Sequence, residues 1–203
     1  MMKRFVITGC LLMAMCFYLA FGFVSFGFAG EDTASRKVGD SVIRELDDYW
    51  SKVSRSVREG DFAAYSATCH PLGVLVSGNK QTSYPLTQAL AGWKQGFDDT
   101  RAKRMSASVE FRFSKRFHDS VTAHETGIFR YATVQDGKSN VQYIHFEGLL
   151  RKSDAGWQIL MEYQRSLATE AEWKMLEPLK SAPKNDVPKA DRSKAKSPPS
   201  DAD

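Results

Sequence analysis

The order of hydrophobic and polar positions divides most of the chain into helices first and long strands afterwards. Apolar residues recur at helical spacing from Val42 to Val57, which predicts one long amphipathic helix that begins near Asp40. Gly60 ends this helix, and Asp61 can cap a second, short helix. Pro85 suits the first turn of a third helix.

From Ser106 onward the spacing changes to an alternation of apolar and polar residues, which is the pattern of a half-buried strand. Three further strands are predicted at Val121–Val134, Val141–Lys152 and Trp157–Arg165. Short polar or glycine-containing turns separate them, so the strands should form an antiparallel meander. An apolar segment, Gly73–Ser77, predicts a short buried strand between the second and third helices.

This order of elements predicts an α+β fold in which a curved antiparallel sheet wraps around three helices. A capping box at Thr169 and Glu172 predicts one more short helix after the strands. The cone-shaped arrangement leaves a concave mouth, and a concave mouth is where a small molecule binds. Alternation alone does not decide which strand face lines the mouth, because a sheet that packs helices inside and a partner outside is apolar on both faces.

The N-terminus carries the pattern of an export signal. Lys3 and Arg4 precede an uncharged apolar run, Phe5–Phe28, and small residues then lead into polar sequence. This pattern predicts a signal peptide over residues 1–29 and an exported protein, periplasmic or secreted. Roughly 20 apolar residues suffice to cross a bilayer, so the alternative is an uncleaved anchor that holds the domain outside the cytoplasm. Contact with a membrane is expected only in that case.

Residues 36–177 form one predicted domain, and residues 178–203 form a tail of Lys, Pro, Ser, Asp and Ala that is too polar to fold. Loss of Lys3 and Arg4 with the signal would lower the net charge from +4 to +2, which argues against a nucleic-acid partner. Cys69 would then be the single cysteine, so no internal disulfide is expected.

Three motifs carry a family resemblance: Gly60-Asp61-Phe62 after the first helix, His70-Pro71 before the short strand, and Gly156–Leu160 in the last strand. With them, residues 40–166 resemble the SnoaL-like, or nuclear-transport-factor-2-like, superfamily, and within it the exported, ketosteroid-isomerase-like branch without an assigned function. The resemblance implies the same cone-shaped fold and a homodimer formed through the outer face of the sheet. It leaves the activity open, because the scaffold hosts enzymes, adaptors and oligomerising hubs.

The resemblance also implies where the chemistry would lie. Enzymes of this superfamily place a carboxylate or histidine as general base inside an apolar cone. The last strand resembles that of kinase-association hubs, which implies that Glu162 and Gln164 face the cavity. The same likeness matches Arg130 to a cavity arginine and brings His124 inward with it. Such a cavity would bind an anionic, hydroxylated or partly apolar ligand, unless Glu162 and Arg130 form a structural ion pair at the rim.

Trp50, Trp93 and His70 complete the predicted ligand-binding residues. For the two tryptophans the alternative is core packing, and for His70 it is a role in the turn. His145 and Glu147 lie two apart on one face of a strand, but two ligands without a third are a weak signal for a metal. No metal and no cofactor is therefore predicted.

Three functions fit these features. The preferred interpretation is an exported binding module that holds a small molecule in the cone. The first alternative is an isomerase, lyase or hydrolase that uses Glu162 with His124 for acid/base catalysis, and the second is a dimeric interaction module. Binding is preferred because the paired aspartate and tyrosine of ketosteroid-type catalysis are not evident, and because Arg130 would suit an anion better than proton abstraction from carbon.

Overall fold

The computed structural model describes residues 31–179, with side chains from residue 38 onward. The predicted signal peptide or anchor over residues 1–29 lies outside the described residues, as does the predicted tail beyond residue 179, and both stay predictions. No helix between residues 31 and 179 is long and apolar enough to cross a membrane.

Helix α1 (Glu31–Glu59) begins before the predicted start at Asp40 and ends as predicted at Gly60. Gly60 adopts a left-handed backbone conformation with φ of +67°. A Cβ at this position would lie 2.4 Å from the backbone nitrogen of Arg101. Both the conformation and the close approach require glycine, which explains the sharp turn into the next helix.

Three shorter helices follow, α2 (Phe62–Ala67), α3 (Leu86–Arg101) and α4 (Glu170–Lys174). The predicted cap of α2 is confirmed, because Asp61 accepts a hydrogen bond of 3.0 Å from the backbone nitrogen of Ala64. The predicted capping box of α4 is confirmed as well.

The sheet is built from six strands, β1 (Cys69–Ser77), β2 (Thr82–Pro85), β3 (Met105–His118), β4 (Thr122–Gln135), β5 (Lys138–Ser153) and β6 (Gly156–Leu167). They form one curved, unclosed sheet in the order β2-β1-β6-β5-β4-β3. Strands β3 to β6 are consecutive antiparallel neighbours, which confirms the meander and the α+β fold. The sheet is mixed and not wholly antiparallel as predicted, because β1 pairs in parallel with β6. Strands β1 and β6 are far apart in the sequence, so no turn motif between them predicts their pairing.

Two β-bulges change which side chains face the concave side of the sheet. An irregularity between Phe113 and Lys115 in β3 turns Arg116 inward, so that its guanidinium lies 4.6 Å from the centre of the Phe113 ring. A second irregularity, where β5 pairs with β6, puts both Ile159 and Glu162 on the concave side. Strict alternation would have placed these two side chains on opposite faces.

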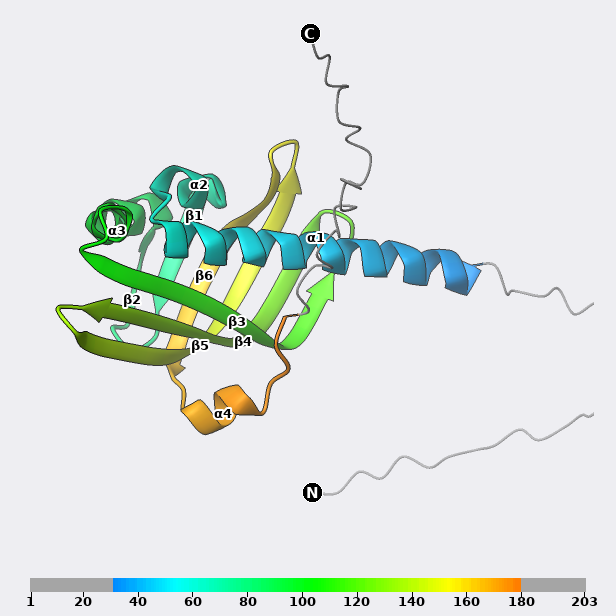
Figure 1. Ribbon diagram of the computed structural model, residues 1–203. Coiled ribbons are helices and arrows are strands. Elements are labelled where there is room, and N and C mark those ends of the chain that lie inside the picture. The colour runs from blue at the N-terminus through cyan, green and yellow to red at the C-terminus, as the bar shows by residue number, and fades with distance from the viewer. Residues whose placement is uncertain (1–30, 180–203) are drawn as a thin grey trace, which may run out of the picture.

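The helices lie on both sides of this sheet. Figure 1 shows α1 lying across the sheet, with α2 and α3 near the end of α1. Helix α4 packs on the outer face, where Trp173 is buried. The Trp173 ring lies 6.0 Å from that of Tyr143, and the guanidinium of Arg112 lies 4.5 Å above it. The chain then meets the edge of β3, where Pro178 pairs with Arg112.

Candidate ligand-binding cavity

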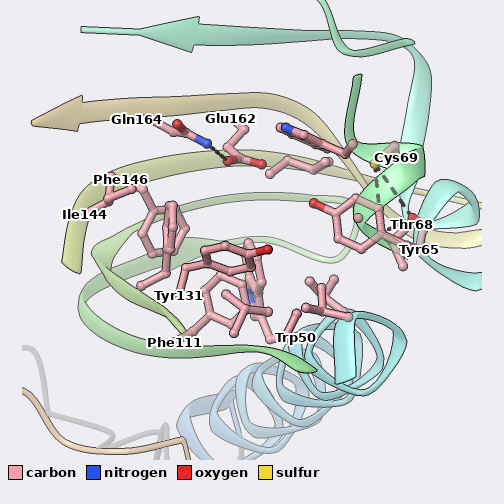
Figure 2. A pocket seen from close by; sticks show the side chains of 18 of the residues that line it. Trp50, Tyr65, Thr68, Cys69, Phe111, Tyr131, Ile144, Phe146, Glu162 and Gln164 are labelled. Atoms are coloured by element: carbon pink, nitrogen blue, oxygen red, sulfur yellow. Dashed lines mark hydrogen bonds between the residues drawn. The ribbon is translucent and has the colours of Figure 1, made fainter. Parts of the chain in front are cut away.

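A cavity of about 410 Å³ lies between the concave face of the sheet and helices α1, α2 and α3. Figure 2 shows side chains from the helices and from the strands converging on this one space. The volume is in the range of pockets that take small ligands. The residues that line it are Tyr49, Trp50, Val53, Val57, Tyr65, Thr68, Cys69, Gly92, Trp93, Gly96, Phe97, Thr100, Ala107, Val109, Phe111, Phe129, Tyr131, Gln142, Ile144, Phe146, Ile159, Glu162 and Gln164.

Aromatic rings form much of the wall. Trp50 projects from α1 onto the sheet, where its ring centre lies 4.4 Å from that of Phe111 and 5.6 Å from that of Phe146. Phe129 packs against the same group, 5.7 Å from Phe146. Tilted and edge-on rings at these separations pack tightly, so this part of the wall is rigid and apolar.

The principal polar group inside is a carboxyl–amide pair on β6. Gln164 donates a hydrogen bond of 2.7 Å from Nε2 to Oε1 of Glu162. Burial raises the pKa of the Glu162 carboxyl above its ordinary value, and the hydrogen bond from Gln164 opposes that rise only in part. Among the described residues that line the cavity there is no lysine, arginine or histidine. The carboxyl therefore has no cation beside it.

Tyrosine hydroxyls and one thiol add further polar atoms. Burial raises the pKa of Tyr65 and Tyr131, and it raises the pKa of Cys69 to about 12, so these groups are neutral at neutral pH. Tyr49 donates a hydrogen bond of 3.1 Å to the backbone oxygen of Thr68. The hydroxyls of Tyr65 and Tyr131 have no such partner among the described residues, and Figure 2 shows both rings directed into the cavity.

The mouth of the cavity opens between α3 and β5, because Gly92 and Gln142 are lining residues that are also exposed. Gly92 and Gly96 stand one helical turn apart on α3, on either side of Trp93. A Cβ at either glycine would meet nothing within 4 Å. Glycine inside a helix lowers its stability. What the two glycines provide in return is open space beside the cavity, because neither has a side chain. The Gly-x-x-x-Gly spacing in the third helix is the sequence signal that could have indicated this mouth.

The structure brings together four of the predicted ligand-binding residues. Trp50, Trp93, Glu162 and Gln164 all line the cavity, although their role in binding stays a prediction. His70 does not line it. Its Nδ1 instead accepts a hydrogen bond of 3.1 Å from the backbone nitrogen of Leu72, which is the turn role that was the alternative.

The inward placement of Arg130 and His124 was wrong. In β4 the side chains of Phe129 and Tyr131 face the cavity, so Arg130 between them points to the outer face. There Arg130 pairs with Glu110 at 2.9 Å, and His124 lies 3.2 Å from Glu147. The alternative, a rim ion pair of Glu162 with Arg130, is not formed for the same reason. The argument for an anionic ligand thereby loses its arginine, and His124 is not positioned to act with Glu162.

The residues predicted least well are those of a buried ionic cluster beside the cavity. Glu125 of β4 has no exposed surface and accepts hydrogen bonds from the indole nitrogen of Trp50 and from Arg116. Arg116 also binds Asp47 of α1. In the sequence, Arg116 follows Arg112 and Lys115 in a basic stretch that gives no sign of a buried side chain. The break in alternation after Phe113 was the available signal.

No group of three or more His, Cys, Asp or Glu side chains within the described part of the chain is arranged to hold a metal ion. His145 and Glu147, the weak candidate pair, are engaged elsewhere. His145 lies 3.2 Å from Glu172 of α4, while Glu147 contacts His124 and Arg165.

No protein-family model matches the sequence, and no curated protein is similar enough to count as a match. Solved structures do match. A nuclear-transport-factor-2-like protein with a cystatin-like fold from Novosphingobium aromaticivorans superposes with a TM-score of 0.54 at 15% identity, over 74% of this chain and 99% of that one. A protein of unknown function from Mycobacterium tuberculosis gives a TM-score of 0.50 at 12% identity, over 70% and 77%. These likenesses confirm the nuclear-transport-factor-2-like fold and carry no information about function.

Proposed function

We propose that this protein binds a small, largely apolar molecule inside its cone. The observation that carries the proposal is the cavity of about 410 Å³, whose wall is largely apolar and rich in aromatic rings, with a few polar side chains among them. Ligand pockets have this composition, because apolar walls supply affinity and a few polar groups fix orientation. The polar end of the ligand would face Glu162 and Gln164, and its body would lie against the rings of Trp50 and Phe111.

Export is part of the proposal and is supported by the sequence of residues 1–29 alone. A binding protein outside the cytoplasm would encounter molecules that cross the outer surface of the cell or are released there. Whether the N-terminal segment is cleaved is measured directly by the mass of the protein purified from its own host.

The mouth of the cavity offers a direct test of binding. Gly96→Leu would place a side chain in the open space beside Trp93, and it should lower affinity for the ligand at least about tenfold by blocking entry, while leucine favours the helix more than glycine does. Ligand retention would be measured by native mass spectrometry of the full chain expressed in its own host. Ala91→Leu, on an exposed position of the same helix, is the matched control and should keep the ligand.

If both variants retain the same small molecule as the wild type, the ligand does not occupy the cavity and the proposal fails. Absence of any retained molecule in the wild type, together with no rise in melting temperature from a broad library of apolar compounds, would also count against it.

Acid/base catalysis is the second candidate, because one specific observation favours it. Burial raises the pKa of Glu162, and shifted carboxyl groups in cavities are typical of catalytic sites. Tyr65 and Tyr131 would supply the hydrogen bonds to a developing oxyanion in place of His124. Incorporation of deuterium from solvent into the carbon next to the carbonyl of a bound ketone, followed by NMR, would detect proton abstraction. No exchange above the rate in buffer would eliminate the reaction.

Homodimerisation through the outer face is a separate proposal. Helix α4 covers one part of that face, and the uncovered part exposes Val74 and Leu149 on either side of Met161. Neighbouring apolar side chains on an open sheet face support self-association. A single species of monomeric mass in sedimentation at micromolar concentration would rule the dimer out.

A further inference from the structure

Glu162 is the one acidic side chain among the described residues that line the cavity, and no basic side chain lines it. Its only hydrogen-bond partner in the described chain is the amide of Gln164, which reaches one of the two carboxylate oxygens. The second oxygen is therefore free to contact a ligand. Figure 2 shows Glu162 directed into the same space as Tyr65 and Tyr131.

The groups that face Glu162 from other elements do not neutralise it. They are Tyr49 of α1, Tyr65 of α2, Cys69 of β1 and Tyr131 of β4, and burial raises the pKa of each. All four are uncharged at neutral pH. An ionised Glu162 would thus be a half-buried negative charge with one amide donor, and such a charge is unfavourable unless a cation joins it.

The wall around this carboxyl would also favour a cation. Aromatic faces attract ammonium groups through the negative potential above the ring, and tryptophan and tyrosine are the strongest of them. Trp50, Trp93, Tyr65 and Tyr131 all line the cavity. An anionic ligand would meet a carboxylate and several ring faces with no positive group in reach.

We propose that the cavity selects a cationic ligand, a protonated or quaternary amine on an apolar body, with its nitrogen beside Glu162 and its body among the rings. This inference rests on the proposed function, because it names the chemical class of the molecule that the cone binds. The amine would complete an ion pair in a cavity that is partly shielded from water and rich in aromatic rings, where a charge pair is stronger than in water.

Three probes with the same phenylbutyl body test the inference: 4-phenylbutylamine, 4-phenylbutanol and 5-phenylpentanoate. They share an apolar body and differ in carrying a positive, a neutral or a negative head group. We expect calorimetry on the full chain to give the tightest binding for the amine, weaker binding for the alcohol and the weakest for the carboxylate. Amine affinity should also decrease as the pH falls through the raised pKa of Glu162, because the protonated acid no longer attracts the ammonium group.

Glu162→Gln removes the charge and keeps the shape and the contact with Gln164. It should weaken amine binding by about thirtyfold and change alcohol binding much less, because the alcohol carries no charge to pair with the carboxylate. Glu110→Gln makes the same change on the outer face, where Glu110 is exposed, and should leave all three affinities as they are.

The outcomes separate this inference from the function on which it rests. If the alcohol or the carboxylate binds as tightly as the amine, or if Glu162→Gln leaves the amine affinity unchanged, the selection of cations is wrong while binding in the cone stands. If none of the three probes binds, the inference falls together with the proposal that the cone binds small apolar molecules.

Discussion

Two carboxyl groups lie on the concave side of the sheet in contrasting surroundings. Glu125 is completely buried against α1, and it is held by Trp50 and by Arg116, which also binds Asp47. Glu162 faces the cavity and has only the amide of Gln164 as a partner. The first carboxyl therefore has its hydrogen bonds supplied by the protein, whereas the second keeps an oxygen available to another molecule.

This difference separates a structural acid from a candidate functional acid. A buried carboxylate that has a donor at each oxygen holds elements together, since removal of one partner leaves the other unpaired. A buried carboxyl with too few partners costs stability, and that cost is typical of a site formed for a ligand. Trp50 joins the two regions, because its indole nitrogen binds Glu125 while its ring lines the cavity.

The largest effect is expected at Arg116. Arg116→Met removes the cation between Glu125 and Asp47 and leaves two carboxylates close together in a mostly buried place. The free energy of unfolding should fall by about 3–5 kcal/mol, measured by urea denaturation.

Arg130→Met is the matched control, because its pair with Glu110 lies on the outer face and Glu110 is exposed. It should cost no more than about 1 kcal/mol. Equal losses for the two arginine variants would show that the Glu125 cluster is not a special source of stability.

A smaller effect is expected at Trp50. Trp50→Phe removes the indole N–H that binds Glu125 and should lower the free energy of unfolding by about 2 kcal/mol. The comparison is Trp93→Phe, whose indole N–H has no protein partner within residues 31–179, and which should cost less. A Trp93 variant as unstable as the Trp50 variant would mean that lost ring volume, and not the bond to Glu125, determines the effect.

The smallest effect concerns Glu162 and pH. Its pKa is raised above the ordinary 4.5, so the folded protein holds this proton more tightly than the unfolded chain does. The contribution of this tighter proton binding to the free energy of unfolding is complete below pH 4.5, and it is lost as the pH rises through the raised pKa of Glu162. Glu162→Gln has no titrating carboxyl at this position and therefore no such loss. Its free energy of unfolding relative to the wild type should increase as the pH rises from 4.5 through the raised pKa of Glu162.

Chemical denaturation at several pH values would measure this difference. Glu45, whose pKa is lowered by its hydrogen bonds from Lys152 and Trp157, contributes the opposite slope in both proteins and cancels in the comparison. A constant difference between the two proteins at every pH would contradict the raised pKa of Glu162.

The sequence predicted those parts of the fold that depend on neighbouring residues. The cap at Asp61, the turn at Gly60, the capping box at Thr169 and the antiparallel hairpins are all encoded within a few positions. The parallel pairing of β1 with β6 was not predicted, because it joins distant segments and depends on how the helices pack.

The candidate site was predicted less completely, for two physical reasons. Bulges in β3 and in the β5–β6 pair shift the alternation, so Arg116 and Ile159 lie on faces that simple counting does not assign to them. In β4 both faces are buried, since Phe129 packs inside and Ile128 is covered outside. Apolarity therefore could not reveal that Arg130 points outward.

The contact of Pro178 with Arg112 has a consequence for how separate copies of the chain meet. Strand β3 is an edge strand of the sheet. The unpaired backbone groups of an edge strand can form hydrogen bonds with a strand of another molecule. The segment after α4 covers this edge at Arg112, where Pro178 pairs with it. Proline has no backbone N–H, so it cannot donate a hydrogen bond to a further strand. Proteolytic removal of the chain from Thr169 onward would therefore expose the edge of β3 and favour pairing of that edge between trimmed molecules.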